Sequence, residues 1–220
     1  MGSRHGKKDD LLQESAPAYK IMPERLKEKK QGEFTIDDYM ALPEEERWEL
    51  IDGHLYRLPA PSTVHQVIAA ELFFAIRRCI EEHAADCLLL TAPTDVQLDM
   101  DERTILEPDL LLLCDLKKLQ EKRIYGAPDF AVEIISPSTR SRDMVLKKEK
   151  YRKAGVREYW IIDPKEKCVI VNLLEKEAYH SGRFDFHSVI PVGISEGKCL
   201  IDFTRIAGKL ESLYEGSVPV

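Results

Sequence analysis

A chain of 220 residues can hold one sizeable domain with a packed core and little more. Its formal net charge of −7 at pH 7 excludes a polybasic, histone-like nucleic-acid binder, so contact with nucleic acid would have to rest on a local patch. No apolar run approaches the roughly 20 residues that a membrane span needs, and the basic N-terminus lacks the apolar segment of a signal peptide. We therefore expect a cytoplasmic protein that does not insert into membranes.

The five cysteines are spread along the chain, and none belongs to a Cys-x-x-Cys pair. They are Cys79, Cys87, Cys114, Cys168 and Cys199. Each lies in or beside an apolar run, which is typical of a buried thiol. The sequence therefore predicts reduced, buried cysteines, in keeping with a cytoplasmic protein.

The beginning of the chain predicts a charged extension, a short helix and a hairpin. Residues 1–31 are charged and weakly patterned, and we expect a flexible extension there. Thr35 is a candidate N-cap for a helix over residues 36–42. The strand-like segments WELI and HLYRL then flank Asp52 and Gly53, a dipeptide that is typical of a tight hairpin turn.

A long helix comes next, followed by short strands. Ser62 is a candidate N-cap, and apolar residues recur at helical spacing over residues 62–84, with His65 on the same face. After this helix, the segments CLLL, TDVQLD and ILEPDLLLLC have the length and composition of strands.

The second half predicts a strand, a crossover helix and further strands. A strongly apolar strand spans residues 129–135, and a helix over 140–154 follows it. More strands and a last helix over 203–214 complete a single domain at residues 32–214, with a tail at 215–220. Because the middle strands are apolar on both faces, helices must cover both sides of the sheet. This pattern predicts an α/β or α+β fold in which helices flank a mixed central sheet.

Three carboxylates stand where the pattern predicts burial. Glu49 and Asp109 are each followed directly by aliphatic residues, and Glu133 lies inside the most apolar strand. An isolated buried carboxylate is costly, so each needs a partner or access to solvent. A salt bridge or a solvent-facing position would explain any one of them. The three together favour a shared divalent cation such as Mg²⁺, which takes oxygen ligands.

The helix after Glu133 places a lysine on its inward face. At about 100° per residue, Asp143, Lys147 and Tyr151 fall on one side of this helix. Lys147 is either a structural partner of Asp143, four residues earlier, or a catalytic cation. Residues 139–153 also hold seven basic side chains against two acidic ones, which indicates either a solvated helix face or a track for phosphates.

Three segments, in this order, carry a resemblance to a known family. They are RWELIDGHLYRLPAPSTVHQVIAAEL, EPDLLLL and DFAVEIISPSTRSRDMVLKKEKYRKAGVREYWIIDP. Over residues 33–206 the chain resembles the Uma-two family, a group of predicted endonucleases. The resemblance implies the restriction-endonuclease fold and a phosphodiesterase site of the PD…(D/E)xK type.

The resemblance implies roles for individual residues in metal-assisted hydrolysis of DNA. Asp109 and Glu133, with the backbone carbonyl of Ile134, match the ligands of Mg²⁺ or Mn²⁺. Lys147 matches the lysine that orients or deprotonates the attacking water, or that stabilises the charge of the transition state. Glu49 matches an acid that orients this lysine or binds a second metal ion.

One position departs from the superfamily pattern. The lysine of the Glu-x-Lys element would stand at Ile135, and Lys147 on the following helix takes its place. Four further matching positions are expected to cap or support the site through helix docking: Ser136, Ser138, Asp143 and Tyr151. His65 also matches a family position, and we interpret it as a structural histidine near a helix start.

Three functional hypotheses follow. The first is a metal-dependent DNA endonuclease, homodimeric by analogy with the superfamily. The second is a catalytically inactive interaction protein with the nuclease fold, which the net charge of −7 favours. The third is a metal-dependent phosphoesterase with a substrate other than DNA. The intact set of Glu49, Asp109, Glu133 and Lys147 favours an enzyme, because a binding module has no need to bury three acids.

Overall fold

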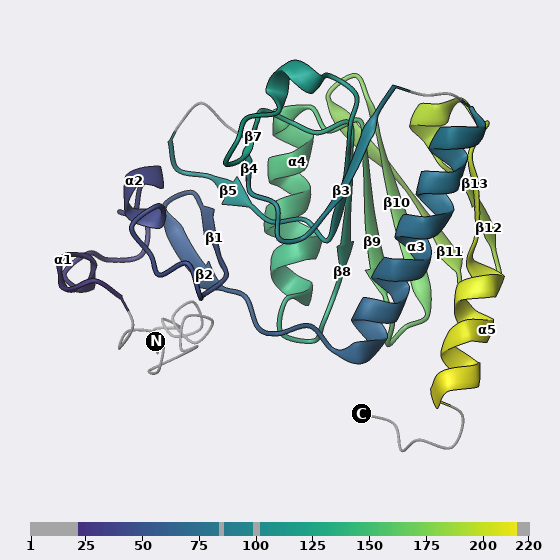
Figure 1. The fold of residues 1–220 in the computed structure, drawn as a ribbon, viewed down its shortest axis with the longest axis horizontal. Coiled ribbons are helices and arrows are strands. Elements are labelled where there is room, and N and C mark those ends of the chain that lie inside the picture. The colour runs from purple at the N-terminus through teal and green to yellow at the C-terminus, as the bar shows by residue number, and fades with distance from the viewer. Residues whose placement is uncertain (1–21, 84–85, 99–101, 215–220) are drawn as a thin grey trace, which may run out of the picture.

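The computed structural model describes residues 22–83, 86–98 and 102–214. The predicted tail at 215–220 and the extension through residue 21 lie outside these ranges. Within them, no helix is long and apolar enough to cross a membrane. The described chain forms a small sheet near its N-terminal end and a larger sheet with helices on both faces (Figure 1).

Ordered structure begins earlier than the predicted extension over residues 1–31 allows. Helix α1 (Glu24–Lys27) precedes α2 (Ile36–Tyr39). Leu26 is only 1% exposed and belongs to a core cluster that also contains Met22 and Phe34. Two apolar anchors among charged residues are enough to fix this segment, and they are too few to produce a periodic pattern in the sequence. The predicted N-cap is confirmed, because the Thr35 side chain accepts a hydrogen bond from the Asp38 amide.

The small sheet has the strand order β2-β1-β5-β4-β7. Its strands are β1 (Trp48–Ile51), β2 (His54–Arg57), β4 (Val96–Gln97), β5 (Ile105–Leu106) and β7 (Ile124–Tyr125). The predicted hairpin joins β1 to β2 through Asp52 and Gly53, which both have positive φ angles. A Cβ atom on Gly53 would lie 2.7 Å from the carbonyl oxygen of Gly32, so the turn requires glycine for space as well as for conformation.

The main sheet has the strand order β11-β10-β9-β8-β6-β3, in which only the β8–β9 pair is parallel. Its strands are β3 (Leu88–Thr91), β6 (Leu110–Leu113), β8 (Phe130–Ile134), β9 (Glu158–Asp163), β10 (Cys168–Glu175) and β11 (Ala178–Asp185). A separate two-stranded sheet pairs β12 (Val189–Pro191) with β13 (Leu200–Asp202). Short 3₁₀ turns occur at η3 (Leu116–Lys118) and η5 (Gly193–Ser195).

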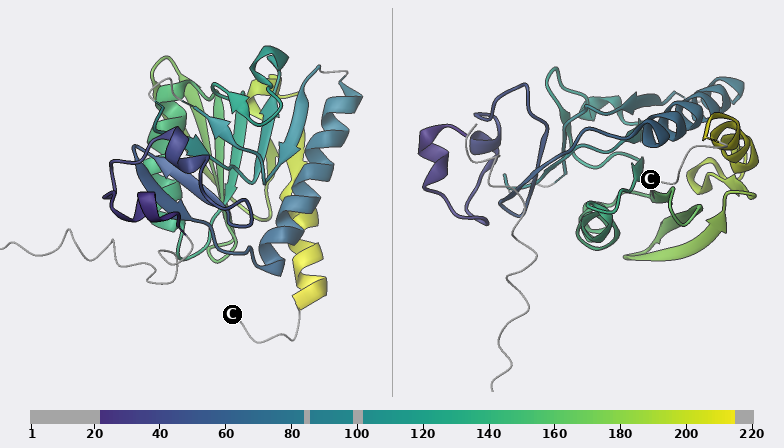
Figure 2. Two further views of the ribbon diagram at one scale, coloured as in Figure 1. Left: turned by 60° about the vertical axis from the view of Figure 1, so that its left-hand side comes forward. Right: turned by 90° about the horizontal axis from the view of Figure 1, so that it is seen from below.

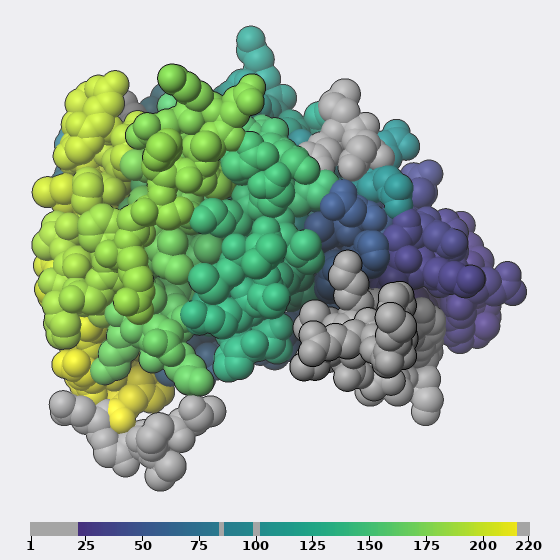
Figure 3. Space-filling model, turned by 180° about the vertical axis from the view of Figure 1, so that it is seen from behind, coloured from purple at the N-terminus to yellow at the C-terminus, as the bar shows by residue number. Residues whose placement is uncertain are grey.

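Helices cover both faces of the main sheet, which confirms the predicted sandwich. On one face α3 (Thr63–Glu82) and α5 (Phe203–Tyr214) lie over a core that contains Leu72, Phe130 and Trp160. On the other face α4 (Lys148–Ala154) packs through Tyr151 against Ala131 and neighbouring apolar residues. Figure 2 shows these layers from two further directions, and Figure 3 shows from behind that the N-terminal and C-terminal segments lie at opposite ends.

The crossover helix differs from the single α-helix predicted over residues 140–154. Its first part is a π-helix, η4 (Arg142–Lys147), which runs directly into α4. The helix ends at Gly155 in the left-handed conformation, with a φ of 85°. A π-helical turn is uncommon and is frequently found at functional sites. The sequence period of an α-helix gives no warning of it.

The expectation of reduced cysteines is wrong for four of the five. Disulfides join Cys79 to Cys199 and Cys87 to Cys114, while Cys168 is free and buried. The second pair follows from strand register, because Leu88 in β3 stands opposite Leu113 in β6 and the next residues outward are the two cysteines. The first pair links α3 to the segment before β13, a contact across 120 residues of sequence that periodicity does not reveal.

Thiol counting tests these bonds. We expect the protein unfolded without reductant to show one reactive thiol, from Cys168, and all five after reduction. Reduction should lower the free energy of unfolding by about 2–4 kcal/mol for each bond, because the cross-links restrict the unfolded chain. A Cys168→Ser variant, as the control, should show no thiol before reduction. Five thiols in the unreduced protein would contradict the pairing.

Candidate active site

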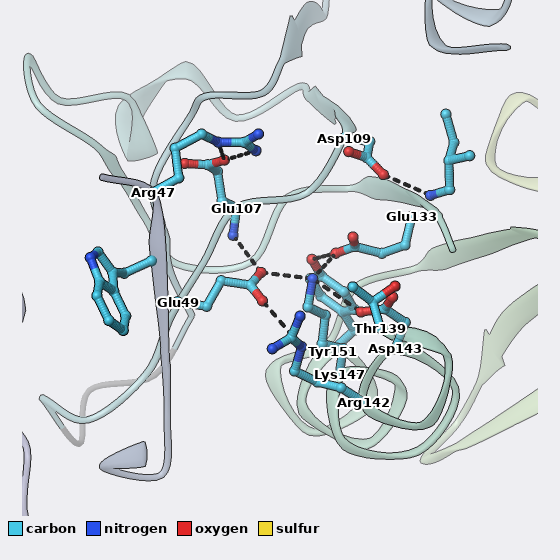
Figure 4. A network of polar contacts seen from close by, with 12 residues as sticks. Arg47, Glu49, Glu107, Asp109, Glu133, Thr139, Arg142, Asp143, Lys147 and Tyr151 are labelled. Atoms are coloured by element: carbon cyan, nitrogen blue, oxygen red, sulfur yellow. Dashed lines mark hydrogen bonds and ion pairs between the residues drawn. The ribbon is translucent and has the colours of Figure 1, made fainter. Parts of the chain in front are cut away.

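Four charged side chains from three elements meet between the two sheets. Glu49 comes from β1, Glu133 from β8, and Asp143 and Lys147 from η4; we call these four residues the Lys147 cluster. The Nζ atom of Lys147 lies 2.7 Å from Glu49 Oε1, 2.9 Å from Glu133 Oε1 and 3.3 Å from Asp143 Oδ1 (Figure 4). The side chain of Lys147 is 3% exposed and that of Glu49 is fully buried. The structure thus brings together three of the four residues predicted as catalytic.

Strand alternation and the π-helix explain how these side chains reach one place. In β8, Ala131 belongs to the core cluster on the α4 side and Val132 to the one on the α3 side. Glu133 follows Val132 and so points toward η4 and α4. In η4, Asp143 and Lys147 are buried while Val145, between them, is exposed. One strand and one helical segment therefore supply three members of the cluster, and the β1 hairpin supplies the fourth.

Buried tyrosines hold two of the carboxyl-bearing segments in place. The hydroxyl of Tyr151 donates a hydrogen bond of 2.9 Å to Glu133 Oε1, which confirms that Tyr151 supports the site. The hydroxyl of Tyr159 donates to the carbonyl oxygen of Asp143 over 3.0 Å. Glu49 is fixed from the other side, since its Oε1 accepts a hydrogen bond from the amide of Glu107.

The cluster holds more negative than positive charge, and the pKa of two members reflects this. Burial raises the pKa of Glu133 well above the usual 4.5, and Asp143, Asp109 and Glu49 raise it further, while Lys147 opposes them. Burial alone would lower the pKa of Lys147, but Glu133, Glu49 and Asp143 together raise it well above 10.5. One ammonium is shared among three carboxylates. We conclude that Lys147 stays charged and that the surplus negative charge favours a proton on Glu133.

The burial of four acids leads to an unusual dependence of stability on pH. Burial raises the pKa of four acids above the usual values of 3.8 and 4.5: Asp95, Glu107, Glu133 and Glu158. Between those values and the raised ones, the folded chain binds more protons than the unfolded chain. The free energy of unfolding of EDTA-treated protein should therefore fall as the pH rises above about 4.5. Denaturant titrations at a series of pH values measure this, and a rise with pH through neutrality would contradict it.

The donor atoms suit a hard divalent cation. Glu49 Oε2 and Asp143 Oδ1 are buried and accept no hydrogen bond within the described chain, while Arg142 Nε lies 3.7 Å from the first and Lys147 Nζ 3.3 Å from the second. Carboxylate oxygens are among the ligands that Mg²⁺ takes in proteins. Among the described residues, no three side chains of histidine, cysteine, aspartate or glutamate converge on a common point as metal ligands. The physical reason is that the carboxylates of the cluster converge on the ammonium of Lys147.

Asp109 lies beside the Lys147 cluster and makes other contacts. Its Oδ2 accepts a hydrogen bond of 2.7 Å from the amide of Ile134, the residue after Glu133. The same oxygen lies 3.1 Å from His65 Nε2. No hydrogen bond or ion pair joins Asp109 to Lys147, both of which the structure describes. Asp109 and Glu133 thus flank one backbone position, and the predicted sharing of a cation between them stays a prediction.

His65 was interpreted from the sequence as a structural histidine, and its contact with Asp109 gives it a place next to the candidate site. It lies in the first turn of α3, where Ser62 caps the helix by accepting a hydrogen bond from the His65 amide. Its other ring nitrogen, Nδ1, is buried without a hydrogen-bond partner in the described chain. The match to a family position was the sequence signal that pointed to this residue.

Residues 36–193 match the model of the Uma2 family, which is described as "Putative restriction endonuclease". The chain belongs to the Uma2 family. This confirms the predicted resemblance, with a match over most of the domain. No curated protein matches the chain.

A solved structure shows the same fold. It is described as a "putative nuclease belonging to DUF820" from Anabaena variabilis. The alignment covers 80% of this chain and 99% of that chain, with a TM-score of 0.64 and 22% sequence identity. The predicted fold, a mixed sheet flanked by helices in the manner of restriction endonucleases, is confirmed.

Sequence reasoning missed a second cation beside the Lys147 cluster. The guanidinium carbon of Arg142 lies 4.9 Å from the centroid of the Tyr56 ring, and Arg142 Nε lies 3.7 Å from Glu49 Oε2. These contacts join the π-helix to the β1–β2 hairpin. No sequence signal pairs them, because the residues are more than 80 positions apart along the chain.

The remaining cations of the basic segment already have partners. Arg140 pairs with Asp163, Lys150 with Asp52, and Arg152 with Glu149. Lys148 donates a hydrogen bond to Ser181 Oγ, and Lys153 lies near Glu149. Of the two interpretations that the sequence left open for this segment, the solvated helix face therefore agrees better with the Uma2 structure than a continuous phosphate track.

Proposed function

We propose that this Uma2 protein is a metal-dependent endonuclease that hydrolyses phosphodiester bonds in DNA. The observation that carries the proposal is the buried ammonium of Lys147 within 3.3 Å of three carboxylates, next to Asp109. A structural ion pair requires one acid, and burying two more is costly unless they serve a purpose. The family description supports the reaction class.

In this proposal each residue of the site has a separate role. The side chains of Asp109 and Glu133, with the carbonyl of Ile134, would hold Mg²⁺ or Mn²⁺. A divalent cation held there would supply Lewis-acid chemistry to the phosphate and to an attacking water molecule. Lys147 orients this water and stabilises negative charge that develops on the phosphate. Glu49 keeps the lysine directed toward the site, since it makes the shortest contact with the ammonium.

Calorimetry with Mn²⁺ tests the metal half of this proposal. We expect wild-type protein to bind Mn²⁺, and Asp109→Ala to bind it more than about 100-fold more weakly, because a direct ligand should cost at least as much as a supporting residue. Asp37→Ala, an exposed aspartate in α2, is the control and should bind as wild type does.

Cleavage assays test the proposed hydrolysis of DNA. Plasmid DNA should be nicked in the presence of Mg²⁺ or Mn²⁺ and left intact in EDTA. If wild-type protein neither binds Mn²⁺ nor cleaves DNA, the inactive interaction protein is the correct description. If it binds Mn²⁺ and hydrolyses only small phosphodiesters, the non-DNA phosphoesterase is correct.

A further inference from the structure

A cavity of about 690 Å³ opens directly beside Asp109. One wall is a flank of α3, and the other is the end of β3 at Thr91 with Ala92 and Pro93 directly after it. The amide of Ala92 donates a hydrogen bond to the carbonyl oxygen of Asp109, which ties the loop to the candidate site. A volume of this size lies within the roughly 300–1,000 Å³ of small-molecule sites.

The α3 wall carries no charged side chain along the cavity. Its lining residues are His65, Gln66, Ala69, Ala70, Phe73 and Phe74. They form a stripe beside the buried stripe of the same helix, which contains Ile68 and Leu72. Phe74 is 63% exposed, the highest value for a large hydrophobic side chain in the part of the chain that the structure describes. Leaving such a ring in water has a cost that a stacking partner would remove.

The two ends of this cavity differ in chemistry. His65 and Asp109 line it at the end next to the candidate site, and Arg47 adds a guanidinium to the lining. Phe73 and Phe74 lie two turns further along α3 from His65 and supply aromatic rings. A nucleotide has the same polarity, with a charged phosphate at one end and a flat aromatic base at the other. A phosphate at Asp109 would therefore bring the attached base toward the phenylalanines.

A base can reach such a ring only if it is unpaired and unstacked. In a duplex the faces of each base are covered by its neighbours, and proteins that hold single strands stack bases on aromatic side chains instead.

We propose that this cavity accepts an unpaired base next to the scissile phosphate, so that the substrate is single-stranded DNA or DNA with a locally unpaired strand. This inference rests on the proposed function and narrows its substrate class. Phe74 is the residue that decides the preference, since it offers an open ring face. The intact duplex is the disfavoured substrate.

Fluorescence anisotropy with a labelled oligonucleotide tests the proposal, with Ca²⁺ in place of Mg²⁺ to supply charge at the site. The probes are one single strand without self-complementarity and the same strand annealed to its complement. We expect wild-type protein to bind the single strand more tightly. Phe74→Ala should weaken single-strand binding roughly 5- to 150-fold, the range for loss of one stacked base. Phe74→Trp keeps an aromatic ring at this position and should bind the single strand about as tightly as wild type. Leu213→Ala, at an exposed leucine on α5, should have no effect.

Several results would overturn the inference. Equal binding of single strand and duplex would do so, as would a Phe74→Ala variant that binds the single strand as wild type does. A Phe74→Ala variant that changes only the oligomeric state in gel filtration would assign the stripe to a second copy of the chain. In each of these cases, if Phe74→Ala still nicks plasmid DNA and Mn²⁺ binding still depends on Asp109, the proposed function stands and only the inference about the unpaired base falls.

Discussion

Replacing Lys147 by methionine should abolish cleavage and lower the free energy of unfolding by about 3–5 kcal/mol. Methionine has a similar length but no charge, so the carboxylates of Glu49, Glu133 and Asp143 would lose the ammonium that lies within 3.3 Å of all three. Removing one partner from a buried ionic group leaves the others uncompensated, and the cost of their burial then appears in full. Cleavage should fail because no group remains to orient the water or to stabilise the charge on the phosphate.

Loss of stability and loss of chemistry can be separated with a second substitution. In the double variant Lys147→Met/Glu133→Gln, one of the uncompensated charges is removed, so much of the stability should return while cleavage stays absent. Lys148→Met is the matched control, because Lys148 is the neighbouring lysine but donates a hydrogen bond to Ser181 and is partly exposed. Denaturant titration and plasmid nicking give the two readouts. A Lys147→Met protein that is as stable and as active as wild type would show that the cluster is neither structural nor catalytic.

The central part of the site could be predicted from sequence because local rules were sufficient there. Glu49 and Glu133 stand inside aliphatic runs, so their burial is visible without a structure. Lys147 falls on the inward face of its helix whether the turn is of the α or the π type, since it remains close to Asp143. The two-faced apolar strands required layers on both sides, and this fixed the class of fold.

The parts that the sequence did not reveal depend on register and on long-range contacts. The disulfide between Cys87 and Cys114 requires the alignment of β3 with β6. The contact between His65 and Asp109 requires the start of α3 to lie next to the residue before β6, which is more than forty residues later in the chain. Such pairings are not encoded in any short window of residues. The helix α1 was not predicted because its segment is short, and two buried side chains are too few to form a recognisable pattern.

The Glu133→Gln variant should be more stable than wild type in the metal-free state and almost inactive. Burial and three neighbouring carboxylates raise the pKa of Glu133, so the ionised side chain is disfavoured in the folded protein. Glutamine has nearly the same shape as a protonated glutamate, and its oxygen can still accept the hydrogen bond from Tyr151. Near neutral pH we expect a gain of roughly 0.5–2 kcal/mol in the free energy of unfolding. Metal binding and cleavage should fall more than about 100-fold, because a ligand charge is lost.

Glu158→Gln is the matched control for this prediction. Burial also raises the pKa of Glu158, but its two oxygens accept hydrogen bonds from the Trp160 ring nitrogen and the Ile194 amide, away from the Lys147 cluster. Glutamine can accept only one of these two bonds, so this variant should lose stability and keep its cleavage activity. Opposite signs in the two variants would show that the Glu133 carboxylate is retained for binding and chemistry at a cost in stability. A Glu133→Gln protein that loses stability and still cleaves DNA would instead make Glu133 a structural partner of Lys147.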